Sequence, residues 1–72
     1  MMEQRIFEFV KECTLNGHTY QIGTQIELFR GIVSMNGGML MEGYQAMFRN
    51  LIENEIRKPN YLREIRQVTH EC

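Results

Sequence analysis

Aspartate is absent from the 72-residue sequence, and all nine acidic residues are glutamates. Glu8 with Glu12 and Glu53 with Glu55 are spaced pairs of a kind that is typical of a solvated face. Magnesium-dependent phosphoryl chemistry needs a converging set of carboxylates, which this pattern does not supply. A glycine-rich phosphate loop and a Gly-x-Ser-x-Gly nucleophile turn are also missing. We therefore predict a protein that is not an enzyme and that uses no cofactor.

The sequence has only two cysteines and no long apolar run. Two cysteines are too few for the disulfide framework of a small secreted domain. No segment approaches the roughly 20 apolar residues of a membrane span. The start of the chain carries Glu3, Arg5 and Glu8, and no apolar run of signal-peptide length follows. We expect a cytoplasmic protein that does not act at a membrane.

Net charge and length are both small. A net charge of −1 gives no general attraction to nucleic acid or to anionic membranes. The length of 72 residues predicts one domain over residues 1–72, with residues 69–72 frayed. Such a domain buries only roughly 60% of the surface that its unfolded chain exposes, and a partner chain often adds stability. Self-association is therefore expected before any motif is considered.

Asn-Gly pairs at residues 16–17 and 36–37 indicate two tight turns between β-prone runs. The first turn would join residues 5–15 to residues 18–28, with Gly23 as a bulge or bend in the second strand. Threonine pairs and aromatic pairs across such a hairpin are favourable. The predicted cross-strand pairs are Leu15 with His18, Thr14 with Thr19, and Cys13 with Tyr20.

The apolar run at residues 26–35 is expected to pair with residues 39–42 across the second turn, with a bend at Gly31. Beyond Gly43, apolar residues recur at helical spacing, and Pro59 ends the pattern. The sequence predicts a helix over residues 43–58 with polar residues on its other side. The predicted apolar face consists of Tyr44, Met47, Phe48, Leu51, Ile52 and Ile56.

The fold class predicted from these elements is α+β, with a small antiparallel sheet of four or five strongly bent strands packed on one helix. The β-branched residues of the tail favour a closing strand over residues 61–69. The hairpin spacing resembles that of small SH3-like open barrels. A mostly helical bundle is the alternative, because Ile6, Phe9, Val10 and Cys13 also fit one helical face.

Four residues form a weak candidate metal site. Two cysteines and two histidines are formally a tetrahedral zinc set, and the hairpin places the first cysteine and histidine on one face. No close Cys-x2-Cys pair supports the set, so we predict no metal and interpret the first cysteine as a small buried side chain. The four residues are Cys13, His18, His70 and Cys72.

A basic stretch near the end of the predicted helix is a candidate for binding nucleic acid. Cations around one aromatic ring can follow a phosphate backbone and stack a base. Cations at a helix C-terminus are also favoured by the helix dipole, and this second interpretation is the better one. The candidate residues are Arg57, Lys58, Tyr61, Arg63 and Arg66.

Methionine and aromatic residues give the strongest functional signal. One helix covers only one face of a sheet, so several apolar side chains are expected to stay exposed for another chain. We predict a non-enzymatic interaction module that forms a homodimer or binds or inhibits a larger protein. A compact chain with no catalytic set is also typical of phage and mobile-element accessory proteins. The candidate contact residues are Met39, Met41, Tyr44, Tyr20 and Phe29.

Overall fold

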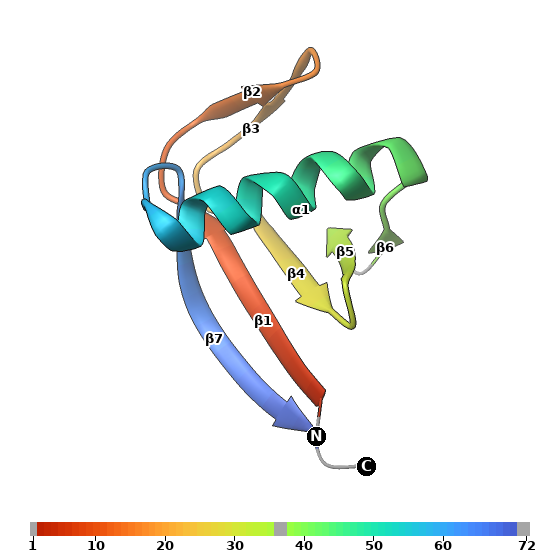
Figure 1. Cartoon of the computed structure of the whole chain (residues 1–72). Coiled ribbons are helices and arrows are strands. Elements are labelled where there is room, and N and C mark those ends of the chain that lie inside the picture. The colour runs from red at the N-terminus through yellow and green to blue at the C-terminus, as the bar shows by residue number, and fades with distance from the viewer. Residues whose placement is uncertain (1, 36–37, 71–72) are drawn as a thin grey trace.

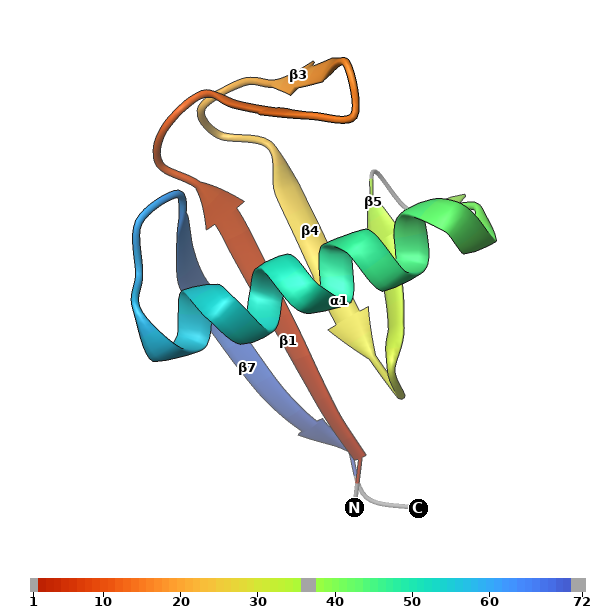
Figure 2. The ribbon, with the colours of Figure 1, turned by 45° about the horizontal axis from the view of Figure 1, so that its top comes forward.

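The computed structural model of the chain describes residues 2–35 and 38–70, with side chains described for residues 4–35 and 38–65. Its elements are β1 (Met2–Phe9), β2 (Cys13–Leu15), β3 (His18–Tyr20), β4 (Gln25–Phe29), β5 (Ile32–Met35), β6 (Gly38–Met39), α1 (Glu42–Arg57) and β7 (Leu62–His70). Within the described ranges, five strands form one antiparallel sheet in the order β6-β5-β4-β1-β7, and β2 pairs with β3. Helix α1 crosses one face of the sheet, and the β2–β3 hairpin lies beyond the ends of β1 and β4 (Figures 1 and 2).

The α+β prediction is confirmed, and the helical-bundle alternative is wrong because β1 takes up the first apolar segment as a strand. The sheet is neither closed nor strongly curled, so the expected strong bending and the resemblance to an SH3-like barrel are also wrong. The path of the chain explains this result. Helix α1 follows β6 at one edge and crosses the sheet to β7 at the other edge, so β6 and β7 lie at opposite edges and the sheet stays open.

The first predicted hairpin is confirmed to the residue. Its three predicted pairs all form, and the hydroxyl oxygens of Thr14 and Thr19 lie 3.0 Å apart. The pairing of β2 with β3 continues the register of β1 with β4, with a break on each strand. Gly23 lies at one break with a φ of 93°. Its N–H donates to the carbonyl of Phe9 at 2.9 Å, so the bend keeps the two halves in register.

The second hairpin differs from the prediction. The run at residues 26–35 is two strands, β4 and β5, joined at Arg30 and Gly31 with φ values of 55° and 74°. Positive φ at both central residues is the geometry of a tight hairpin turn, and arginine is not a typical residue for it. The second Asn-Gly turn lies outside the described residues. Strand β6 follows it with only Gly38 and Met39, paired with the end of β5.

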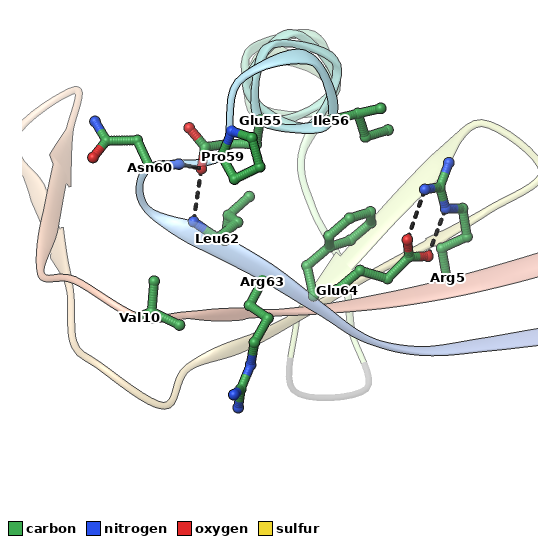
Figure 3. A pocket seen from close by; sticks show the side chains of 10 residues that line it. Arg5, Val10, Glu55, Ile56, Pro59, Asn60, Leu62, Arg63 and Glu64 are labelled. Atoms are coloured by element: carbon green, nitrogen blue, oxygen red, sulfur yellow. Dashed lines mark hydrogen bonds and ion pairs between the residues drawn. The ribbon is translucent and has the colours of Figure 1, made fainter.

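Helix α1 covers the range predicted for it to within one residue at each end. After Pro59 the chain reverses into β7, and the Glu55 carboxylate holds the reversal. Its Oε1 accepts three backbone N–H groups, and Figure 3 shows the last of these bonds, from Leu62. In the described ranges, no helix has the length and apolar character needed to cross a membrane.

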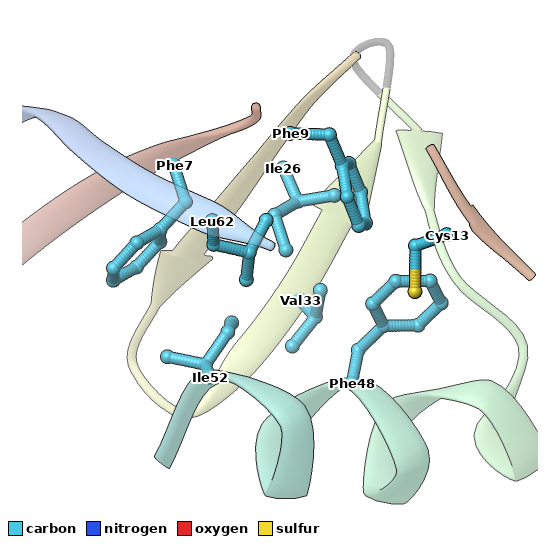
Figure 4. Packing of buried hydrophobic residues seen from close by; sticks show 8 residues of the cluster. All are labelled: Phe7, Phe9, Cys13, Ile26, Val33, Phe48, Ile52 and Leu62. Carbon is cyan, nitrogen blue, oxygen red and sulfur yellow. The ribbon is translucent and has the colours of Figure 1, made fainter. Parts of the chain in front are cut away.

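The core lies between α1 and the sheet face that it crosses (Figure 4). From the helix, Phe48 and Ile52 point toward the strands, and Phe9 and Val33 reach them with no exposed surface. Cys13 extends the same core toward the β2–β3 hairpin. The buried apolar residues are Phe7, Phe9, Cys13, Ile26, Val33, Phe48, Ile52 and Leu62.

The tail is a strand, as predicted, and it forms the long outer edge of the sheet. Thr69 and His70, which were expected to fray, pair with the backbone of Glu3 and Met2 at the end of β7. Residues 71–72 lie outside the described part of the chain. The register between β1 and β7 shifts between Ile6 and Phe7, which leaves one extra residue in β7 as a β-bulge.

Candidate protein-binding surface

A hollow of about 320 Å³ lies between the β2–β3 hairpin, β6 and the first turn of α1. Four of the five predicted contact residues line it. Met39, Met41 and Tyr44 lie close together where β6 leads into α1, and Tyr20 comes from the hairpin, which forms the opposite wall. The lining residues are His18, Tyr20, Met39, Leu40, Met41 and Tyr44.

Aromatic contacts hold one wall of this hollow in place. The Tyr20 ring stacks on Phe9 at 5.6 Å and meets the edge of Phe48 at 5.3 Å between ring centroids. His18 meets Tyr44 edge-on at 5.9 Å. Burial raises the pKa of the Tyr20 phenol, and Tyr44 and Cys13 raise it further, so Tyr20 stays neutral at physiological pH. Pairs of this geometry add stability beyond the area that they bury.

The other wall consists of methionines with little cover. The exposed fractions of Met39 and Met41 are 72% and 71%. Leu40 lies between them and is half-buried, and its carbonyl accepts a 3.0 Å hydrogen bond from the Gln45 side chain. The backbone is therefore fixed while the two thioethers remain adaptable, and methionine can adjust its shape to a contacting surface.

Phe29 does not belong to this hollow. It is half-buried in β4 and pairs with Ile32 and Gln4. The neighbouring positions of β4 and β5 face the core, so Phe29 lies on the sheet face away from α1. The Arg30 guanidinium lies over its ring at 5.4 Å from the centroid. Phe29 therefore lies on a different surface from the other four candidate contact residues.

The predicted basic residues do not form one surface either. Arg57 and Lys58 are exposed at the end of α1, whereas Arg63 points away from the helix in Figure 3. Arg63 pairs with Glu8 at 3.3 Å, and Tyr61 is half-buried. The side chain of Arg66 is outside the described set. The structure thus separates the described members of the group onto different sides of the domain.

The candidate metal ligands are similarly spread. Cys13 is a free, buried cysteine, and burial raises the pKa of its thiol, with a smaller effect from Glu55. A neutral buried thiol is a poor metal ligand. The backbone of His70 lies at the far end of β7 from the hairpin that carries His18 (Figure 1). Cys72 lies outside the described residues, and no group of three or more candidate ligands occurs among the described ones.

Two lining residues were not predicted as protein contacts. His18 had been considered only as a metal ligand, and Leu40 had not been singled out. The position of Leu40 between Met39 and Met41 was an available signal for it. The contact between His18 and Tyr44 had no sequence signal, because it joins a hairpin to a helix across 25 intervening positions in a geometry set by the whole fold.

An ion pair joins the edge strand β7 to its neighbour β1. The Arg5 guanidinium donates two hydrogen bonds to the Glu64 carboxylate, at 2.7 and 2.8 Å. These bonds hold the pKa of Glu64 below its ordinary value of 4.5, and burial opposes them. A lowered folded pKa means that the pair stabilises the fold above about pH 4.5, and this contribution is lost as the pH falls.

Glu64→Gln is therefore expected to reduce the free energy of unfolding at pH 7 by less than about 1 kcal/mol, because the pair is partly exposed and solvent-screened. The difference from the parent chain should shrink as the pH falls below 4.5, since the parent Glu64 then becomes protonated. Urea unfolding at several pH values would measure this convergence. A difference between the two chains that stays constant down to pH 3 would contradict the assigned role of the carboxylate.

Comparison with known protein families, with curated proteins and with solved structures finds no match to this chain.

Proposed function

We propose that this protein is a non-enzymatic interaction module that binds another protein chain through the hollow beside Met39 and Met41. The observation that supports this proposal is the exposure of two methionines, at 72% and 71%, beside a wall of fixed aromatic rings. Most large apolar side chains of a small domain are needed for its own core. Two that are left exposed beside a hollow are better explained by contact with a partner.

The size of the hollow supports a particular kind of contact. About 320 Å³ is at the low end of small-molecule pockets, and it accommodates one large side chain from a partner. Contacts of this kind, with an aromatic or aliphatic anchor in a pocket, provide most of the energy of many interfaces. The partner is either a second copy of this chain or a larger protein. A cytoplasmic setting fits the free buried thiol of Cys13.

The proposal is tested by placing a charge on each exposed methionine. In Met39→Glu and Met41→Glu, an unpaired carboxylate would be buried at the interface, so partner affinity is expected to fall at least tenfold, as is usual for a central contact. Light scattering after size exclusion measures self-association, and quantitative affinity capture measures binding to another protein. Both variants should unfold at nearly the parent temperature, because the two side chains have few packing contacts to lose.

Ile32→Glu is the matched control, because Ile32 is also an exposed apolar residue but lies on the sheet face away from α1. It should keep the partner and the oligomeric state of the parent chain. The proposal would be rejected if the parent chain is monomeric and both methionine variants retain every captured partner.

A further inference from the structure

A second surface lies at the opposite edge of the sheet from the hollow. Among the described residues, strand β7 is nine residues long and pairs only with β1, whereas β6 at the other edge has two residues. An unpaired strand edge presents backbone donors and acceptors that fit another strand. The backbone groups of β7 that face this edge follow from its register with β1.

The backbone bonds of β1 fix which positions of β7 face outward. The N–H and C=O of Phe9 both bond toward β4, whereas the N–H of Val10 bonds to Tyr61 on the β7 side. Backbone direction alternates along an antiparallel strand. Phe7 therefore also faces β4, and its partner Glu64 turns its own N–H and C=O away from β1. The same rule, applied beyond the bulge, assigns Gln67 and Thr69 as outward positions.

The capped start of β7 agrees with this assignment. The N–H of Leu62 points away from β1 and is taken by Glu55 at 2.7 Å. The first N–H that faces the outer edge beyond this cap is that of Glu64. A ligand for this edge must offer alternating donors and acceptors at strand spacing, which the backbone of an extended chain does.

A groove of about 440 Å³ lies beside this edge on the helix side (Figure 3). Phe7 and Leu62 are among its lining residues, and Ile56 and Pro59 lie on its helix side. Ile56, predicted to be part of the helix face that packs on the sheet, is 48% exposed. The helix crosses the strands obliquely, so its last turn leaves this apolar side chain beside the sheet and incompletely covered.

The charged groups at the groove are already engaged. Glu64 is bound by Arg5, Glu55 by three N–H groups, and Arg63 by Glu8. A charged side chain entering the groove would meet no unpaired opposite charge among these. An apolar side chain would gain contact with Phe7, Ile56 and Leu62, so the lining favours an uncharged occupant.

We propose that β7 accepts an antiparallel strand from a different protein, with a large apolar residue opposite Glu64 whose side chain enters the groove. Residues directly opposite in an antiparallel pair lie on the same face, so that side chain and Glu64 share the groove side of the sheet. A second copy of β7 fits less well, because its outward positions beyond the capped Leu62 are Glu64, Gln67 and Thr69, which are all polar residues. This surface is separate from the hollow and does not depend on the function proposed above.

The test uses the full chain and a phage-displayed library of random peptides as the probe. The enriched peptides are expected to carry a large apolar residue within a β-prone segment. When an enriched peptide binds, the amide hydrogens of Glu64, Gln67 and Thr69 should exchange more slowly with solvent. This readout reports backbone hydrogen bonds directly, and it does not require a substituted protein.

Two pairs of variants add energetic evidence. Gln67→Pro removes an outward donor and keeps the pairing with β1, since proline is tolerated at such an edge position. We expect about tenfold weaker binding than for Gln67→Ala, the value of one lost hydrogen bond. Ile56→Glu places a charge in the groove and should weaken binding at least as much. Ile22→Glu, at an exposed isoleucine that does not line the groove, should have no effect.

The remaining outcomes overturn the inference. They are a library that yields no binder above background, and peptides that leave the exchange of the three amides unchanged. Self-association that protects the same amides would identify a second copy as the occupant. If Met39→Glu weakens peptide binding and Ile56→Glu does not, the peptide occupies the hollow. That result would support the proposed function and reject the β7 site.

Discussion

Replacing Glu55 with alanine is expected to lower the free energy of unfolding by about 3 kcal/mol, because three buried or half-buried N–H groups lose their acceptor. Oε1 of Glu55 receives the N–H groups of Asn60, Tyr61 and Leu62 at 2.9, 2.6 and 2.7 Å. The side chain is only 7% exposed, so water cannot fully replace it. A loss of this size is a large share of the stability of a domain this small.

Urea unfolding followed by circular dichroism would measure the effect, or show that the variant is already unfolded. Glu53→Ala is the matched control, because Glu53 lies in the same helix and is exposed. Its effect should stay within about 0.5 kcal/mol. Glu55→Gln keeps an oxygen acceptor without the charge and should fall between the two alanine variants. Equal stability of the two alanine variants would refute the role assigned to the Glu55 carboxylate.

Replacing Gln45 with alanine is expected to lower the free energy of unfolding by about 2 to 3 kcal/mol. The buried Gln45 amide bonds the backbone of β5 as a neighbouring strand would. Its Oε1 accepts the N–H of Val33 at 2.7 Å, and its Nε2 donates to the carbonyl of Val33 at 2.7 Å. A third bond, from Nε2 to the carbonyl of Leu40, fixes the segment that lines the hollow. The substitution therefore removes an anchor shared by the core and the candidate surface.

Gln45→Glu tests the donor half of this arrangement. The carboxylate can still accept from Val33, but it cannot donate to either carbonyl and would face both as a buried charge. We expect a loss at least as large as that of the alanine variant. Gln25→Ala, at an exposed position of β4, should be nearly neutral. Thermal and urea unfolding of the three variants would compare these costs, and a stable Gln45→Glu chain would contradict them.

Gln45 and Glu55 also mark where interpretation of the sequence was wrong. Helical periodicity placed both on the polar, solvated side of α1, yet both are buried. Conversely, Ile56 belongs to the apolar pattern but is about half exposed, at 48%. Periodicity predicts the average direction of a helix face. It contains no information on which backbone groups of other strands will need a partner at each position.

Several local features were determined by sequence alone. The first Asn-Gly turn fixed the register from Cys13 to Tyr20, because a two-residue turn permits only one pairing. The apolar spacing and Pro59 fixed the helix to within one residue at each end. Met39, Met41 and Tyr44, which line the hollow, could be named as candidates because methionine and tyrosine beside a hairpin are typical of contact surfaces. Each of these features depends on residues close together in the chain.

Tertiary structure decided how these pieces are arranged. It set the strand order, left β7 as the long outer edge, separated Phe29 from the hollow, and moved Arg63 away from Arg57 and Lys58. It also gave two polar helix residues backbone partners, for Gln45 in β5 and for Glu55 at the start of β7. The reason is physical: pairing and burial across the fold depend on the path of α1 over the sheet, and no local pattern in the sequence specifies that path.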